Sequence, residues 1–273
     1  MRFAHISDLH VCSGPAAGAT AREDIIATVE ALAGDLARIA GCLDFIVLSG
    51  DMTDDARPES FRKLEELFAP LALPIFTVPG NHDGPAAYFR EVASGRLAEG
   101  DLTGRVVDLG AVRLLGLDTC VENEATGALS AQALDLVARE LDSNDLSQLI
   151  IVMHHPPFAP GLRQFDEIVR LEGAAELARL VAGAARAPIV LSGHVHRAYQ
   201  ARWNGANCFV AGSAVLPFTA EHPYGDGPIR PSAEQRCYFV HAIDADGMHV
   251  VTPQPVRSVA SAREPTRADP DGV

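Results

Sequence analysis

The sequence predicts an α/β protein in which two β-sheets pack together with helices on the outside. Short apolar runs rich in β-branched residues alternate with amphipathic stretches over most of the chain, which is typical of βα units. Between residues 198 and 251 the alternation gives way to short strands and hairpins. Hydrophobic residues make up 48% of the 273 residues, enough for a sizeable globular core.

Five buried strands are predicted from short apolar runs that turn residues bound on both sides. They cover residues 3–6, 45–48, 75–78, 149–153 and 189–191. Two hairpins are also predicted: residues 106–109 lead through Gly110 into residues 112–115, and Asp246-Gly247 forms a turn between two late strands.

Helices are predicted where apolar residues recur at helical spacing. Thr20 and Glu23 form a capping-box pair at the start of a first helix that runs to Ile39. Further helices are expected at residues 58–68, 130–141 and 173–185, with Pro58 and Ser130 as plausible first residues.

We expect one domain over residues 1–257. Within it, residues 212–235 are expected to form a loop region near the mouth of the site, because residues 222–235 are rich in proline and glycine. Residues 258–273 have almost no apolar content, which predicts a disordered tail.

The composition limits the compartment and the partners. Asp8 precedes any signal-peptide hydrophobic stretch, no segment approaches the roughly 18 apolar residues of a membrane span, and the five scattered cysteines form no C-x-x-C pair. The formal charge of −14 argues against nucleic acid and anionic membranes, which are polyanions. We expect a cytoplasmic protein that acts on a small molecule. The late segment from Cys208 onward would form either a homo-oligomer surface or a lid.

Polar side chains follow five of the predicted strands, at the point where each strand ends. Ligands bind at this edge of open α/β sheets, where the loops converge. Six of the ten histidines lie in these short segments, which are Asp8-Leu9-His10, Gly50-Asp51, Gly80-Asn81-His82-Asp83, His154-His155-Pro156-Pro157 and Gly193-His194-Val195-His196.

These side chains are metal ligands by type. Imidazole nitrogens with carboxylate and amide oxygens, and without thiolates, suit Mn, Fe, Co or Zn. They are too many for one ion and suit two ions about 3.5–4 Å apart that share a carboxylate. The sequence therefore predicts a dinuclear metal site.

The set D-x-H, G-D, G-N-H-D, H-x-P and G-H-x-H, in this order over roughly residues 1–200, resembles the calcineurin-like metallophosphoesterases. The stretches SDLH, SGDMTD, VPGNHD and MHHPP resemble the class III cyclic-nucleotide phosphodiesterases and the related bacterial glycerophosphodiesterases. The resemblance implies two mixed β-sheets sandwiched between helical layers. Asp54 stands where the purple acid phosphatases carry a ligand tyrosine.

The resemblance also implies residue roles. Asp8, His10 and His196 would hold one metal, Asn81, His154 and His194 the other, and Asp51 would bridge them. His82 would face the substrate and protonate the leaving alkoxide or stabilise charge on phosphate oxygens. Together with Asn81 and Asp51, it would form the catalytic set. The family ligand lies two residues before a proline, which selects His154 over His155. Asp54 and Asp55 would either cap the helix near Pro58 or support the metal site.

The expected function is a dinuclear-metal phosphodiesterase for small soluble diesters, with cyclic nucleotides as first choice. Two divalent ions, two carboxylates and one hydroxide leave a charge near +1, which complements a singly charged diester. Arg163, in the loop after the His-His-Pro-Pro motif, is a candidate substrate contact. The alternatives are a glycerophosphodiesterase, a nucleotide pyrophosphohydrolase that uses Arg197 or Arg230, and a non-catalytic metal-binding scaffold.

Overall fold

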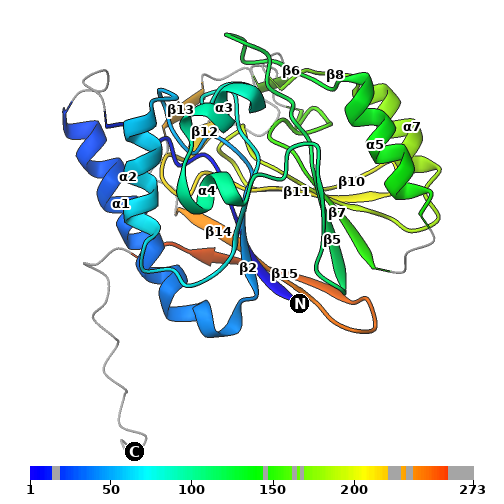
Figure 1. Ribbon diagram of the computed structural model, residues 1–273, viewed down its shortest axis with the longest axis horizontal. Coiled ribbons are helices and arrows are strands. Elements are labelled where there is room, and N and C mark those ends of the chain that lie inside the picture. The colour runs from blue at the N-terminus through cyan, green and yellow to red at the C-terminus, as the bar shows by residue number, and fades with distance from the viewer. Residues whose placement is uncertain are drawn as a thin grey trace, which may run out of the picture.

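The computed structural model describes residues 1–13, 19–143, 147–161, 165–166, 169–220, 229–231 and 236–257. Two mixed β-sheets pack face to face, and helices cover their outer faces (Figure 1). The four-layer arrangement agrees with the sequence prediction.

The first sheet has five strands in the order β15-β14-β1-β2-β3. Strands β1 (Arg2–Ile6), β2 (Phe45–Leu48) and β3 (Ile75–Thr77) run parallel, and β14 (Cys237–Ile243) and β15 (His249–Pro255) add an antiparallel edge. The predicted Asp246-Gly247 turn joins β14 to β15, and Gly247 has the positive φ of 81° that this turn requires.

The second sheet has six strands in the order β10-β11-β9-β7-β5-β4. Its four central strands are parallel: β5 (Val112–Gly116), β7 (Gln148–Val152), β9 (Ile189–Ser192) and β11 (Ala206–Val210). Antiparallel strands β4 (Val106–Asp108) and β10 (Tyr199–Trp203) form the edges. The β4–β5 pair is the predicted early hairpin.

Apolar side chains fill three interfaces between these layers. Between the sheets, Phe3 and Phe45 of the first pack with Ile150 and Leu191 of the second. Helices α1 (Ala19–Ile39) and α2 (Pro58–Phe68) bury their apolar faces against the first sheet, and α5 (Ala131–Leu141) and α7 (Ala174–Ala182) against the second. Helix α5 is capped by Ser130, whose side chain accepts a hydrogen bond from the Ala133 N–H at 3.1 Å.

Several boundaries differ from the prediction. Helix α1 begins at Ala19, so Thr20 lies inside the helix and not at its N-cap. Helix α7 ends at Ala182 rather than at residue 185, because Gly183 stands as its C-cap. The short elements η1 (Ala40–Cys42), α3 (Ala86–Val92), α4 (Gly95–Glu99), β6 (Gly127–Ala128) and β8 (Leu171–Glu172) carry too few residues to show a periodic pattern.

The predicted loop region 212–235 contains a small hairpin, in which β12 (Phe218–Ala220) pairs antiparallel with β13 (Ile229–Pro231). The rest of residues 221–235 and the predicted tail 258–273 lie outside the described residues. Within the described part of the chain, no helix has the length and apolar character that crossing a membrane requires.

Candidate metal centre

The carboxyl ends of five strands bring the seven predicted ligands to one edge of the sandwich. Their donor atoms form two groups, each within 4.8 Å, that share Asp51. Asp8, His10 and His196 belong to the first group, and His154 and His194 to the second. Asn81 joins the second group through its Oδ1 atom, which lies 3.1 Å from Nε2 of His154. The structure therefore brings the seven predicted ligands together, with the Asp51 carboxylate in both groups.

The backbone of these loops adopts a conformation that ordinary residues avoid. Five of the seven clustered residues have φ between 47° and 75°: Asp8, His10, Asp51, His194 and His196. Each such residue costs on the order of 1–3 kcal/mol, and such strain clusters at functional sites. Hydrogen bonds between the loops maintain it: the Asp8 N–H donates to Gly50 O at 3.0 Å, and the His194 N–H donates to the Asp8 carboxylate at 3.0 Å.

Gly50 and Gly80 allow the loops to approach the ligand side chains. Gly50 has φ of 100°, and a Cβ at this residue would collide with the His154 ring. A Cβ at Gly80 would collide with the Asp51 carboxylate. Both glycines therefore let the backbone lie directly against a side chain of the cluster.

Three imidazoles are oriented so that their Nε2 atoms point into the cluster. Nδ1 of His154 lies 2.8 Å from Ser49 O, Nδ1 of His196 lies 2.7 Å from Leu216 O, and Nδ1 of His10 lies 3.2 Å from Asp54 Oδ1. Since each of these partners is an acceptor, each Nδ1 carries the proton.

The inward-facing Nε2 atoms of His10 and His196 then lie 2.9 Å apart with no donor between them. Lone pairs that face one another at this distance repel unless a cation lies between them. Nε2 of His154 lies 3.4 Å from Asp51 Oδ2, so a cation at this ring nitrogen would face a carboxylate. The donor set therefore fits metal ions.

Electrostatics inside the cluster also favours cations. Burial raises the pKa of the Asp8 carboxyl to about 6, and the Asp51 carboxylate adds to this. Burial opposes charge on Asp51 as well, but His154 and His10 keep its pKa well below the usual range. Although burial opposes it, Asp51 raises the pKa of His154 to about 9, so the site stabilises positive charge at this ring.

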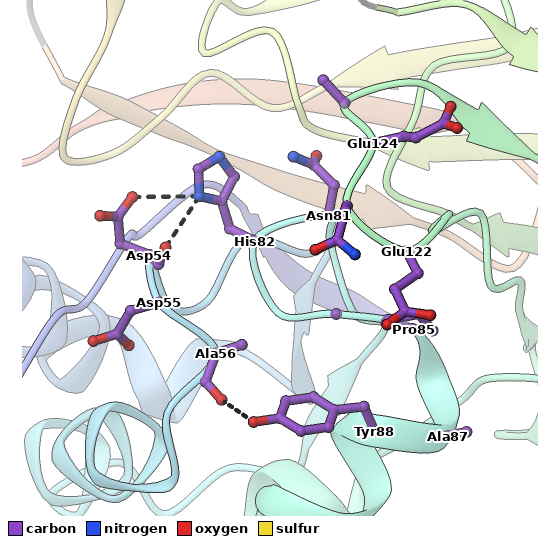
Figure 2. Close-up of a pocket in the computed structure, with 13 residues that line it drawn as sticks. Asp54, Asp55, Ala56, Asn81, His82, Pro85, Ala87, Tyr88, Glu122 and Glu124 are labelled. Carbon is purple, nitrogen blue, oxygen red and sulfur yellow. Dashed lines mark hydrogen bonds and ion pairs between the residues drawn. The ribbon is translucent and has the colours of Figure 1, made fainter.

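His82 and Asp54 form a pair beside the cluster (Figure 2). Nδ1 of His82 lies 3.3 Å from Asp54 Oδ1 and 3.2 Å from Asp54 O, and the His82 N–H donates to Asp51 Oδ1 at 2.9 Å. The hydrogen bond to Asp54 is the largest cause that raises the pKa of His82 to about 9. The His82 side chain is 40% exposed, so it faces the space where a substrate would lie.

A family model of the calcineurin-like phosphoesterases matches residues 1–198. The chain belongs to this family. The matched range includes all seven residues of the cluster and His82, since the last of them is His196.

Two curated relatives and one solved structure extend this assignment. A probable cyclic nucleotide phosphodiesterase of Rhodococcus erythropolis is 30% identical over 83% of this chain and 74% of its own length. A probable glycerophosphodiester phosphodiesterase, GpdQ, of Arcobacter nitrofigilis is 27% identical over 59% of each chain. A dimetal phosphatase of Danio rerio superposes with a TM-score of 0.69 at 15% identity, covering 94% of this chain and 97% of its own, which confirms the phosphoesterase fold.

The structure also places the other candidate residues, His155, Asp54 and Asp55. His155 is buried outside the cluster, with Nδ1 2.8 Å from Thr119 Oγ1 and Nε2 3.2 Å from Ala125 O. Of the two adjacent rings, His154 is therefore the one that enters the cluster. Asp54 does not cap α2, because the N-cap of this helix is Arg57 and no side chain caps it. Asp55 accepts hydrogen bonds from the Arg57 N–H at 3.2 Å and from Cys12 Sγ at 3.3 Å.

Asp83 has a structural role that the sequence did not predict. Its buried carboxylate accepts hydrogen bonds from the N–H groups of Met52, Thr53 and Gly80 at 2.8–3.0 Å. It thereby fastens the loop after β2 to the loop after β3, and so positions Asp51 against Asn81. The G-N-H-D motif offered an indication of this role, because its final aspartate was the one charged residue of the motif without a proposed function.

Two candidate substrate-contacting arginines are not placed in the site. Arg163 and the side chain of Arg230 lie outside the described residues. Arg197 lines a cavity of about 130 Å³ together with His196 and Phe218, and it does not line the pocket beside His82.

Proposed function

We propose that this chain is a dinuclear-metal phosphodiesterase that hydrolyses small soluble phosphodiesters, with 3′,5′-cyclic nucleotides as the first choice. The observation that carries the proposal is the buried cluster of seven donors in two groups that share Asp51. The match to the probable cyclic nucleotide phosphodiesterase supports the substrate class, since it extends over more of the chain than the match to the glycerophosphodiesterase.

Asp8, His10 and His196 would hold one ion, Asn81, His154 and His194 the other, and Asp51 both. Mn, Fe, Co and Zn suit this nitrogen and oxygen set. When bound, two such ions lower the pKa of a coordinated water and offset the negative charge that develops on phosphate oxygens. The residues of the chain fix the spacing of the donors and keep their lone pairs directed inward.

His82 would act on the leaving group. It is exposed toward the substrate side, and its Nδ1 is held by Asp54, so Nε2 is the atom that would donate a proton to the departing alkoxide. The amide of Asn81, beside it, would orient the phosphate. Both residues, with Asp51, form the proposed catalytic set.

The composition supports a proposal for compartment and partners. We propose action in the cytoplasm, because the five scattered cysteines form no C-x-x-C pair. We also propose a small substrate without nucleic acid or membrane as partner, because the formal charge is −14. The proposed domain spans residues 1–257. A scaffold without catalysis would be expected to lack a ligand or His82, and none is missing here.

The test is a substrate panel with the purified full chain loaded with Mn, Fe, Co or Zn in turn. Cyclic AMP, cyclic GMP, glycerophosphoethanolamine and ADP-ribose are compared by kcat/KM, with Asn81→Ala as the inactive control. We expect metal-dependent hydrolysis, with the highest kcat/KM on a cyclic nucleotide. Highest activity on ADP-ribose would favour the pyrophosphohydrolase instead, and no hydrolysis with any metal would support the scaffold.

A further inference from the structure

A pocket of about 780 Å³ lies beside the cluster of proposed metal ligands, and most of its lining residues do not belong to that cluster. We propose that its aromatic residue Tyr88 is the platform on which the base of a nucleotide substrate stacks, and that Tyr88 thereby determines specificity for nucleotide diesters. The inference rests on the proposed phosphodiesterase function and names the residue that selects the substrate's organic part.

Two contacts hold the Tyr88 side chain in place. Its hydroxyl donates a hydrogen bond to Ala56 O at 3.0 Å. Ala56 has φ of 52°, a backbone conformation that alanine rarely adopts, and its carbonyl oxygen accepts the hydrogen bond from the Tyr88 hydroxyl. The ring itself lies against Gly84, where an added Cβ would stand 3.0 Å from Tyr88 Cδ1.

The helix that carries Tyr88 is also anchored. The Ala86 N–H, in the first turn of α3, donates to the Asp118 carboxylate at 3.0 Å, which ties α3 to the end of β5. Despite these contacts Tyr88 remains 41% exposed. A large aromatic side chain that is fixed at its edge and tip but open to a pocket is prepared to stack, because little conformational freedom is lost on binding.

The pocket connects this ring to the reacting centre. His82 and Asn81 line it together with Tyr88, so a diester held at the metal cluster can extend toward the ring (Figure 2). Its volume lies within the range of about 300–1,000 Å³ that is typical of small-ligand sites.

The charge of the pocket walls further limits which ligands can bind. Asp54, Asp55, Glu122 and Glu124 line the pocket, and no lysine or arginine does so among the residues that the structure describes. Carboxylates accept hydrogen bonds from the amino and hydroxyl groups of a nucleoside, but repel further phosphates. A glycerol ester could satisfy the carboxylates but would leave the aromatic face without a partner. A cyclic mononucleotide fits both the face and the walls.

The experiment compares Tyr88→Ala, Tyr88→Leu and Tyr88→Phe on cyclic AMP and on glycerophosphoethanolamine. Loss of base stacking predicts that Tyr88→Ala and Tyr88→Leu raise KM for cyclic AMP about 5- to 20-fold, and that Tyr88→Phe, which keeps the ring, changes it less than about 3-fold. KM for glycerophosphoethanolamine should not change. Met248→Ala is the matched control, because Met248 is an exposed large side chain beside Met1, at the other end of β1.

A binding measurement separates this inference from the proposed function. Chelator-treated protein is mixed with adenosine, which carries no phosphate, and saturation transfer to the adenine protons is recorded by NMR. We expect transfer with wild type and Tyr88→Phe, and its loss with Tyr88→Ala and Tyr88→Leu.

If wild type hydrolyses no diester, the proposed function fails, while the adenosine measurement still decides the role of Tyr88. Equal effects on both substrates, or an unchanged KM for cyclic AMP in a folded Tyr88→Ala or Tyr88→Leu protein, would overturn the inference. So would adenosine binding that is the same in all variants.

Discussion

Asp54 Oδ1 lies 3.3 Å from Nδ1 of His82, and the same oxygen lies 3.2 Å from Nδ1 of His10. One carboxylate therefore orients both the proposed proton donor and a proposed metal ligand. The two rings stand edge to face with centroids 4.7 Å apart, so displacement of one would disturb the other.

Removal of this carboxylate should affect metal binding and turnover together. In Asp54→Ala, Nδ1 of His10 loses its acceptor, and the ring is no longer fixed with Nε2 inward. Residues that support a ligand in this way typically contribute 10- to 100-fold to metal affinity or activity. We expect a fall of about that size in kcat/KM, together with weaker binding of one ion in a metal titration followed by calorimetry.

The control is Asp55→Ala, which removes the neighbouring carboxylate. Asp55 contacts Arg57 and Cys12 but none of the clustered imidazoles. Asp55→Ala should keep wild-type metal affinity. The assignment is wrong if Asp54→Ala retains both metal affinity and rate.

His82→Ala should discriminate between leaving groups. General acid catalysis typically contributes about 10²- to 10⁴-fold, and it matters most when the leaving oxygen is a poor leaving group. We expect kcat to fall within this range for cyclic AMP, whose leaving group is an alkoxide, and much less for bis(p-nitrophenyl) phosphate. Metal content should stay at the wild-type level. Equal losses for the two substrates would exclude a proton-donating role.

His154 and His155 are adjacent, but substitution should have different consequences. His154→Ala removes a lone pair from the cluster, so elemental analysis should show loss of one of the two ions. His155→Ala leaves the cluster complete but removes partners from Thr119 and Ala125 O, which should lower the free energy of unfolding by about 1–3 kcal/mol. Full metal content in His154→Ala would argue against the proposed ligand set.

The sequence predicted the layers and the place of the site for one physical reason. Strands buried on both faces are continuous apolar runs, and the ends of parallel strands share one edge of a sheet. Residues that follow those runs, such as Asp8, Asp51 and His194, could therefore be expected to lie together at that edge.

The supporting contacts could not be predicted in this way. Asp54 reaches His82 across 28 positions, and Tyr88 reaches Ala56 across 32, through turns with positive φ that no local pattern specifies. The start of α1 was misplaced because the motif Thr20-x-x-Glu23 also occurs within the first turn of a helix.

Acid sensitivity should depend in part on His5, which lies between the sheets. Burial lowers the pKa of His5 from 6.5 to about 3. Its Nε2 lies 2.9 Å from Ser49 Oγ, and its Nδ1 has no partner. The unfolded chain binds a proton at this residue below pH 6.5 and the folded chain does not. The contribution of neutral His5 to the free energy of unfolding is therefore fully present above pH 6.5, and it is lost as the pH falls toward 3.

At pH 5 this loss amounts to about 2 kcal/mol for one residue. His5→Gln can keep the contact with Ser49 but does not titrate. Urea unfolding of chelator-treated protein at pH 7.5 and pH 5 should therefore show a smaller decrease in the free energy of unfolding for the variant than for wild type, by about 2 kcal/mol. Equal decreases in the two proteins would mean that His5 does not remain neutral in the folded chain.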